Sequence, residues 1–230
     1  YGKGFLFDGA TVLRCDSDTS GKLQRLGDLT VAVVFQFATL PASGKWSCIF
    51  TVDGEGPDAI PGNNCLCLLA LMPTGKLKIA YEIEGEAQSL IPDIELSSNT
   101  LYHAVLSRSG GSSSLYLNGA LLGTLQHTPV EGGSNTKLYI GGYEVFTPDD
   151  SFLNGLVASL AFYETAATAY EAKRLYADAA LLWGSRPGVG DDTVQAHAST
   201  HDEGGDDEVT ITEGQLSFSD VTTGDASASA

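Results

Sequence analysis

Short apolar runs separated by turn-forming residues fill the first 183 positions of the chain. Leu29–Phe37 is a long apolar run rich in β-branched side chains, and residues 76–86 alternate between apolar and charged positions. Alternation with a period of two is typical of a strand with one buried face. Asp8-Gly9 and Asn118-Gly119 are tight-turn signals, and the second pair favours a hairpin. The pattern predicts an all-β, antiparallel sandwich.

Eleven strands and one helix account for this pattern. The predicted strands are residues 5–7, 11–13, 29–37, 46–52, 65–71, 76–86, 102–108, 114–117, 121–125, 138–140 and 156–162. Residues 167–182 are rich in alanine and leucine, with bulky side chains recurring at Tyr170, Leu175 and Leu182, and predict a short C-terminal helix. We expect the helix to pack on the sandwich and close an edge or an end.

The composition changes sharply after Trp183. Residues 184–230 hold one basic residue against ten acidic ones, and Phe218 is their only aromatic side chain. Such a segment cannot bury enough apolar surface to fold alone. The sequence therefore predicts a sandwich domain at 1–183 and an extended acidic linker or oligomerisation segment at 184–230.

The order of motifs in the first domain resembles laminin-G-like, concanavalin A-like jelly-roll domains. The resemblance is carried by the strand LYHAVLSR at 101–108, the hairpin LYLNGALLGT at 115–124, LYIGG at 138–142 and FLNGLVASLAFY at 152–163. Tyr102 stands where this family usually has tryptophan, which keeps an aromatic plug in the core. The resemblance implies a jelly roll, a fold that hosts lectins, adhesion modules and glycosidases and so does not settle function.

The acidic segment resembles elements of bacteriophage fibre and tail-associated proteins. The similar stretches are AHASTHDEGGDD at 196–207 and LSFSDVTTGDAS at 216–227. This resemblance implies a virion structural protein, assembled in the bacterial cytoplasm, with other virion proteins as partners. We expect the segment to form a homotrimer. The side chains expected between chains are Val209, Ile211, Leu216, Phe218 and Val221.

The charge of the whole chain excludes two classes of partner. The 12 basic and 29 acidic residues give a net charge of −17. Such a chain repels a phosphate backbone and an anionic lipid surface, so nucleic-acid and membrane-surface roles are not expected. No apolar run approaches the ~20 residues that a membrane helix needs.

A saccharide site in this fold needs a stacking aromatic ring beside polar groups. Trp46, Tyr143 and Phe146 lie in or near loops and are the candidates, with host-surface carbohydrate as the ligand. The alternative is that all three rings plug the sandwich.

A calcium site is a second candidate, because glycine-rich loops with several carboxylates can coordinate this ion. The alternative is a set of solvated turns. The candidate ligands are Asp53, Glu55, Asp58, Asp149 and Asp150.

Catalysis is not expected. Glu82, Glu84 and Glu86 superficially resemble the carboxylate strand of retaining glucanases with this fold, but Gly85 interrupts the run. His103, within an apolar strand, is expected to be a structural histidine with its hydrogen bonds satisfied. The sequence favours a virion protein that displays a lectin-like domain. The alternatives are a stand-alone carbohydrate-binding module and a glycoside hydrolase.

Overall fold

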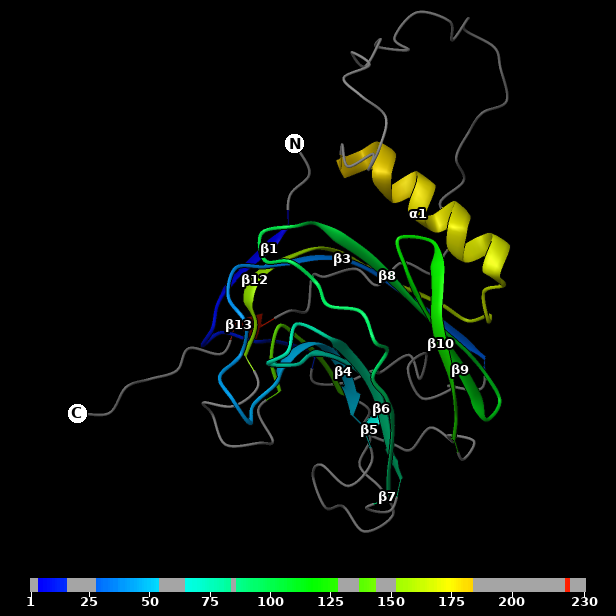
Figure 1. Ribbon diagram of the computed structural model, residues 1–230, viewed down its shortest axis with the longest axis horizontal. Coiled ribbons are helices and arrows are strands. Elements are labelled where there is room, and N and C mark those ends of the chain that lie inside the picture. The colour runs from blue at the N-terminus through cyan, green and yellow to red at the C-terminus, as the bar shows by residue number, and fades with distance from the viewer. Residues whose placement is uncertain are drawn as a thin grey trace, which may run out of the picture.

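The computed structural model describes residues 4–15, 28–53, 65–83, 86–127, 137–143, 152–183 and 222–223. Two antiparallel sheets stack face to face, and the helix α1 (Ala169–Trp183) lies over the outer side of one of them (Figure 1). This arrangement is the sandwich with one C-terminal helix that the sequence predicts. The loop residues Glu55, Asp58, Phe146, Asp149 and Asp150 lie outside the described residues.

Each sheet combines strands that are distant in the sequence. In spatial order, the helix-side sheet contains β1 (Phe5–Asp8), β12 (Asn154–Tyr163), β3 (Leu29–Phe37), β8 (Tyr102–Ser109), β9 (Ser112–Leu117) and β10 (Ala120–Gln126). The second sheet, here called the open sheet, contains β13 (Thr222–Thr223), β2 (Leu13–Cys15), β11 (Lys137–Ile140), β4 (Ser47–Asp53), β5 (Cys65–Leu71), β6 (Leu77–Ile83) and β7 (Glu86–Leu90).

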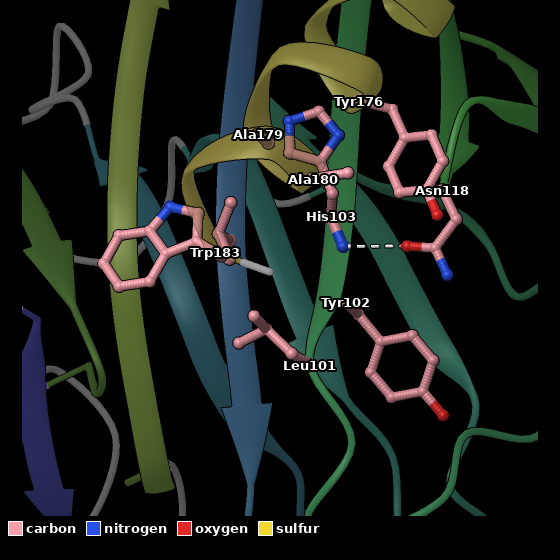
Figure 2. Close-up of a pocket in the computed structure, with 9 residues that line it drawn as sticks. Leu101, Tyr102, His103, Asn118, Tyr176, Ala179, Ala180 and Trp183 are labelled. Atoms are coloured by element: carbon pink, nitrogen blue, oxygen red, sulfur yellow. Dashed lines mark hydrogen bonds between the residues drawn. The ribbon is translucent and has the colours of Figure 1, made fainter. Parts of the chain in front are cut away.

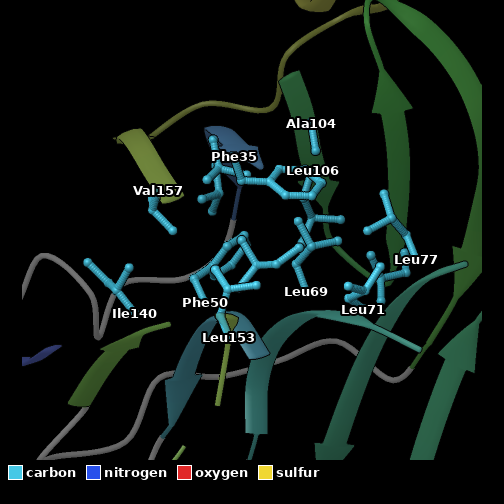
Figure 3. Packing of buried hydrophobic residues seen from close by; sticks show 14 of the residues in the cluster. Phe35, Phe50, Leu69, Leu71, Leu77, Ala104, Leu106, Ile140, Leu153 and Val157 are labelled. Carbon is cyan, nitrogen blue, oxygen red and sulfur yellow. The ribbon is translucent and has the colours of Figure 1, made fainter. Parts of the chain in front are cut away.

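The main core fills the space between the sheets, where side chains from the two layers point toward one another (Figure 3). Phe35 of β3 and Phe50 of β4 have no exposed surface, and neither has Leu69 of β5. Burial of each such side chain stabilises the fold by about 1.5–3 kcal/mol. Because alternate residues of each strand face inward, the residues between them lie on the outer faces of the sheets.

The helix begins with a capping box that fixes its position after β12. The backbone N–H of Thr168 donates to Glu171 Oε2 at 2.7 Å, and the N–H of Glu171 donates to Thr168 Oγ1 at 3.3 Å. This reciprocal pair satisfies donors that a helix start leaves open. The helix therefore begins at Ala169, two residues later than expected.

The helix packs on the sheet, as expected, and a small side chain lies at the centre of the contact. Ala172 is fully buried against Ala32, Val105 and Tyr116, and Leu175 packs against the same cluster. Tyr170 and Leu182 are 71% and 78% exposed. An alanine at the contact allows the helix axis to approach the sheet closely.

Asp8-Gly9 forms the expected turn, in which Asp8 Oδ1 accepts from the backbone N–H of Ala10 at 3.0 Å. The strands on either side of it, β1 and β2, join different sheets. One local prediction needs correction. The expected strand over 76–86 is two strands, β6 and β7, paired through Ile83 and Glu86. The Glu84-Gly85 dipeptide separates them.

The Asn118-Gly119 hairpin is confirmed. Both residues have positive φ angles, 48° and 78°, as a two-residue turn between β9 and β10 requires.

Of the acidic segment, Thr222 and Thr223 alone are described. They form β13, which pairs with Arg14 and Leu13 of β2 at the edge of the open sheet. The residues predicted to lie between chains, Val209 to Val221, fall outside the described part, so the oligomerisation of this segment stays a prediction.

Candidate functional site: an aromatic corner of the open sheet

Four aromatic side chains gather on the outer face of the open sheet. This aromatic corner consists of Trp46, Tyr139, Tyr143 and Phe152. Tyr139 and Tyr143 are 3% and 1% exposed and pack edge to face, with ring centroids 5.1 Å apart. Trp46 and Phe152 are half-buried against the same cluster. The corner thus has a rigid, buried base and two partly exposed rings.

One side-chain and two backbone hydrogen bonds bring the three contributing segments together at one end of β4. The Ser47 hydroxyl donates to the carbonyl of Phe152 at 2.9 Å. The N–H of Gly141 donates to the carbonyl of Ile49 at 3.0 Å, and the N–H of Leu153 donates to the carbonyl of Gly141 at 2.8 Å. These bonds hold the segments that carry Trp46, Tyr143 and Phe152 beside one another.

Two glycines permit this packing. Gly141 has a φ of 75°, and a Cβ at this position would overlap the ring of Phe7. A Cβ on Gly142 would lie 2.6 Å from Phe152 Cδ1. Only glycine combines a positive φ with such close approach. Tyr139 and Phe152 were not among the predicted site residues. The Gly141-Gly142 pair is the sequence signal that could have placed them in the site.

The structure brings together two of the three predicted ligand-binding residues. Trp46 and Tyr143 share the aromatic corner, whereas Phe146 lies outside the described residues. The burial of Tyr143 favours a supporting role, because a ring with 1% exposure offers no face to a ligand. Trp46 is only partly buried, and a ring with an accessible face can stack on a ligand.

Of the candidate calcium ligands, only Asp53 lies within the described part of the chain, where it ends β4 and its backbone pairs with Lys137 and Cys65. Among the described residues, no group of three or more His, Cys, Asp or Glu side chains is placed to hold a metal ion. The calcium site stays a prediction.

A small pocket lies on the opposite side of the molecule, between α1 and the helix-side sheet (Figure 2). Its volume is about 30 Å³, enough for a water molecule rather than a ligand. The Asn118 turn is held here, because Asn118 Oδ1 accepts from the backbone N–H of His103 at 3.0 Å. Tyr176 and Trp183 of the helix close the pocket.

His103 does not fit the expectation of a fully satisfied histidine. Its Nδ1 is buried and has no hydrogen-bond partner among the described residues. Burial lowers the pKa of the imidazole from 6.5 to about 4, since the charged form cannot be solvated there. His103 is therefore neutral at pH 7, and it is a packing residue beneath the helix.

A buried chain of polar groups links the two sheets. The Tyr81 hydroxyl and Ser113 Oγ are 2.7 Å apart, and Ser113 Oγ lies 2.8 Å from His127 Nε2. The rings of Tyr81 and His127 stack with centroids 4.1 Å apart. A Ser–His contact can activate a nucleophile, but Ser113 has no exposed surface that a substrate could reach. This arrangement supports a structural role.

The single strand that was expected to carry both Glu82 and Glu86 is divided between β6 and β7. In the pairing register, Glu82 lies opposite Ala87 and Glu86 lies opposite Ile83. Positions 82 and 86 therefore belong to two neighbouring strands.

Sequence comparison identifies the class to which this sandwich belongs. The profile of a laminin-G-type family, described as the concanavalin A-like lectin/glucanases superfamily, matches residues 15–173. The chain belongs to this family. A sequence search among curated proteins found no match.

Solved structures share the fold at low sequence identity. A heptameric SAP-like pentraxin from Limulus polyphemus is 17% identical, with a TM-score of 0.51 over 74% of this chain and 83% of the pentraxin. The CBM40 of a Ruminococcus gnavus sialidase, bound to α2,3 sialyllactose, is 13% identical, with a TM-score of 0.56 over 76% of this chain and 96% of the module.

A Trypanosoma rangeli sialidase in complex with sialic acid is 20% identical, with a TM-score of 0.57 over 76% of this chain. The match covers 27% of the sialidase. At such identities these likenesses confirm the jelly-roll fold and nothing beyond the fold.

Proposed function

We propose that this chain is a bacteriophage virion protein whose sandwich binds a host-surface saccharide without catalysing a reaction. The observation that carries the proposal is the aromatic corner on a sandwich of a lectin-containing family. The CBM40 and pentraxin neighbours support it by analogy of fold. The division of positions 82 and 86 between β6 and β7 supports a proposal without glycosidase chemistry.

Trp46 is the residue on which we expect the sugar to stack. Its indole is half-buried against the cluster that contains Tyr139 and Tyr143, so the ring is held in place before a ligand arrives. A platform that is already ordered loses little side-chain entropy on binding. The apolar face of a pyranose packs against such a ring, while its hydroxyl groups bond to polar groups at the rim.

The virion assignment is supported by the fibre-like stretches at 196–207 and 216–227. In this proposal the acidic segment joins three copies, and the three sandwiches face outward. Three linked sites gain avidity without any new contact, so each site can bind weakly. Other virion proteins would hold the opposite end of the assembly.

A glycan microarray probed with the whole chain tests the proposed function. We expect a limited set of saccharides to retain the protein, and we expect Trp46→Ala to weaken retention about tenfold, as loss of one stacking ring predicts. Tyr170→Ala is the matched control, because that ring is 71% exposed on the far side of the molecule. Equal retention of wild type and Trp46→Ala would exclude the aromatic corner, and a blank array would overturn the proposal.

A further inference from the structure

A second concave site lies beside α1, on the face opposite the aromatic corner. This helix-side groove has a volume of about 210 Å³. Thr30, Tyr163 and Thr165 form one wall, and Glu171, Arg174 and Asp178 form the other. Drug-sized pockets begin at about 300 Å³. The groove therefore suits a single sugar ring better than an extended oligosaccharide.

Tyr163 supplies an aromatic surface at the groove. Its side chain is 41% exposed, which is enough for one face of a ligand to stack on it. Partial burial and the nearby Asp178 carboxylate raise the pKa of its phenol, so the hydroxyl stays protonated and able to donate a hydrogen bond.

The wall that carries Tyr163 is fixed by hydrogen bonds. Thr30 Oγ1 donates to the carbonyl of Thr165 at 2.7 Å and accepts from the N–H of Ala167 at 2.7 Å. Thr30 itself has 1% of its surface exposed. Its hydroxyl thus ties the chain that follows β12 to β3, and it sets the distance between Tyr163 and the helix.

The opposite wall presents charged groups at a helical spacing. Glu171, Arg174 and Asp178 follow one another at intervals of three and four residues, so they share one face of α1. Glu171 is engaged in the helix cap. Arg174 and Asp178 remain as a planar donor and a planar acceptor, which match neighbouring hydroxyl groups of a sugar ring.

The charge of the groove selects among saccharides. Its lining has two carboxylates and one guanidinium, and the chain carries a net charge of −17. A sugar that bears a carboxylate would be repelled, whereas a neutral hexose would not. We propose that the helix-side groove is a second saccharide site, specific for a neutral hexose unit, with Tyr163 as its stacking ring and Asp178 and Arg174 as its polar contacts. This inference rests on the proposed function.

Saturation-transfer NMR of the whole chain with methyl α-glucoside, methyl β-galactoside and N-acetylneuraminic acid tests the groove. We expect at least one neutral hexoside to bind wild type and the Trp46→Ala variant. Tyr163→Ala should weaken this binding about tenfold, as loss of a stacking ring predicts. Tyr163→Phe should retain most of it, Asp178→Asn should reduce it, and Tyr170→Ala should leave it unchanged.

The outcomes separate this inference from the proposed function. Hexoside binding that survives Tyr163→Ala but disappears in Trp46→Ala overturns the groove and leaves the aromatic corner standing. Stronger binding of N-acetylneuraminic acid than of either hexoside also overturns it. If no saccharide gives saturation transfer with the wild type, the groove is not a saccharide site. The proposed function is decided separately, by the microarray. Because Tyr163 and Asp178 are exposed, neither substitution should change the melting temperature by more than a few degrees.

Discussion

His103 shows how one side chain couples the helix to the pH of the medium. It lies beneath α1, beside the Asn118 turn and with its ring centroid 6.1 Å from that of Tyr176. A neutral imidazole is accommodated there, but an imidazolium would be buried without an opposite charge among the described residues that line the pocket. The free energy of unfolding therefore depends on the protonation of this residue.

The sign of that dependence follows from proton linkage. In the unfolded chain His103 titrates near its ordinary pKa of 6.5, whereas in the fold it stays neutral down to about pH 4. Between these values the unfolded state binds more protons, so stability is lost as the pH falls from 6.5 to 4. We expect His103→Leu to remove this loss, on the order of 3 kcal/mol at most.

Urea unfolding at a series of pH values measures the difference. The wild-type and His103→Leu curves share the contributions of the carboxylates, so the difference between them isolates His103. Parallel curves between pH 7 and pH 4 would contradict the assignment.

At the scale of elements, the open sheet depends on close approach at Gly141. This residue adopts a φ of 75° directly after β11, and the ring of Phe7 occupies the space in which a side chain would lie. The same turn leads to Tyr143 and the aromatic corner. The local backbone thus connects the core between the sheets to the proposed binding surface.

Gly141→Ala is expected to destabilise the domain by about 3 kcal/mol or more, from backbone strain together with overpacking. Gly44→Ala is the matched control, because Gly44 has a φ of 80° but a Cβ there would meet nothing within 4 Å. It should cost only the strain, about 1 kcal/mol. Thermal unfolding monitored by circular dichroism compares the two, and equal losses would show that Phe7 can move aside.

The strands and the family were accessible from the sequence because they depend on local pattern. The alternation in Leu77–Ile83 and the Asn118-Gly119 turn each determine a structure within a few residues. The helix contact through Ala172 and the aromatic corner could not be predicted from the sequence, because both depend on which distant segments meet. Trp46 and Phe152, for example, are distant in the sequence but pack against the same cluster, where the Ser47 hydroxyl donates to the Phe152 carbonyl.

The molecule as a whole has two outer faces with different chemistry. The open sheet carries the aromatic corner, and the helix-side sheet carries α1 with its charged groove. The helix among the described residues is too short and too polar to cross a bilayer. Placement on a virion, with both faces available, remains our proposal.

At the scale of the whole molecule, we expect three copies of the chain to form a trimer. Light scattering of the full chain should give three times the chain mass of 24.0 kDa. The paired change Phe218→Asp and Val221→Asp should convert the trimer to a monomer, because charges would then be buried between chains. Leu121→Asp, at a position that is 55% exposed on β10, is the control and should leave the trimer intact. A monomeric wild-type chain would end the trimer proposal.

The central claim, that a saccharide binds at Trp46, can be followed directly through the two tryptophans of the chain. Trp46 lies at the aromatic corner and Trp183 at the end of α1, so their indole N–H signals in a ¹⁵N–¹H spectrum report on the two faces separately. On titration with the strongest saccharide from the microarray, we expect the Trp46 signal to shift and saturate while the Trp183 signal stays in place. A Trp46 signal that does not move at a saturating concentration of that saccharide would contradict the account.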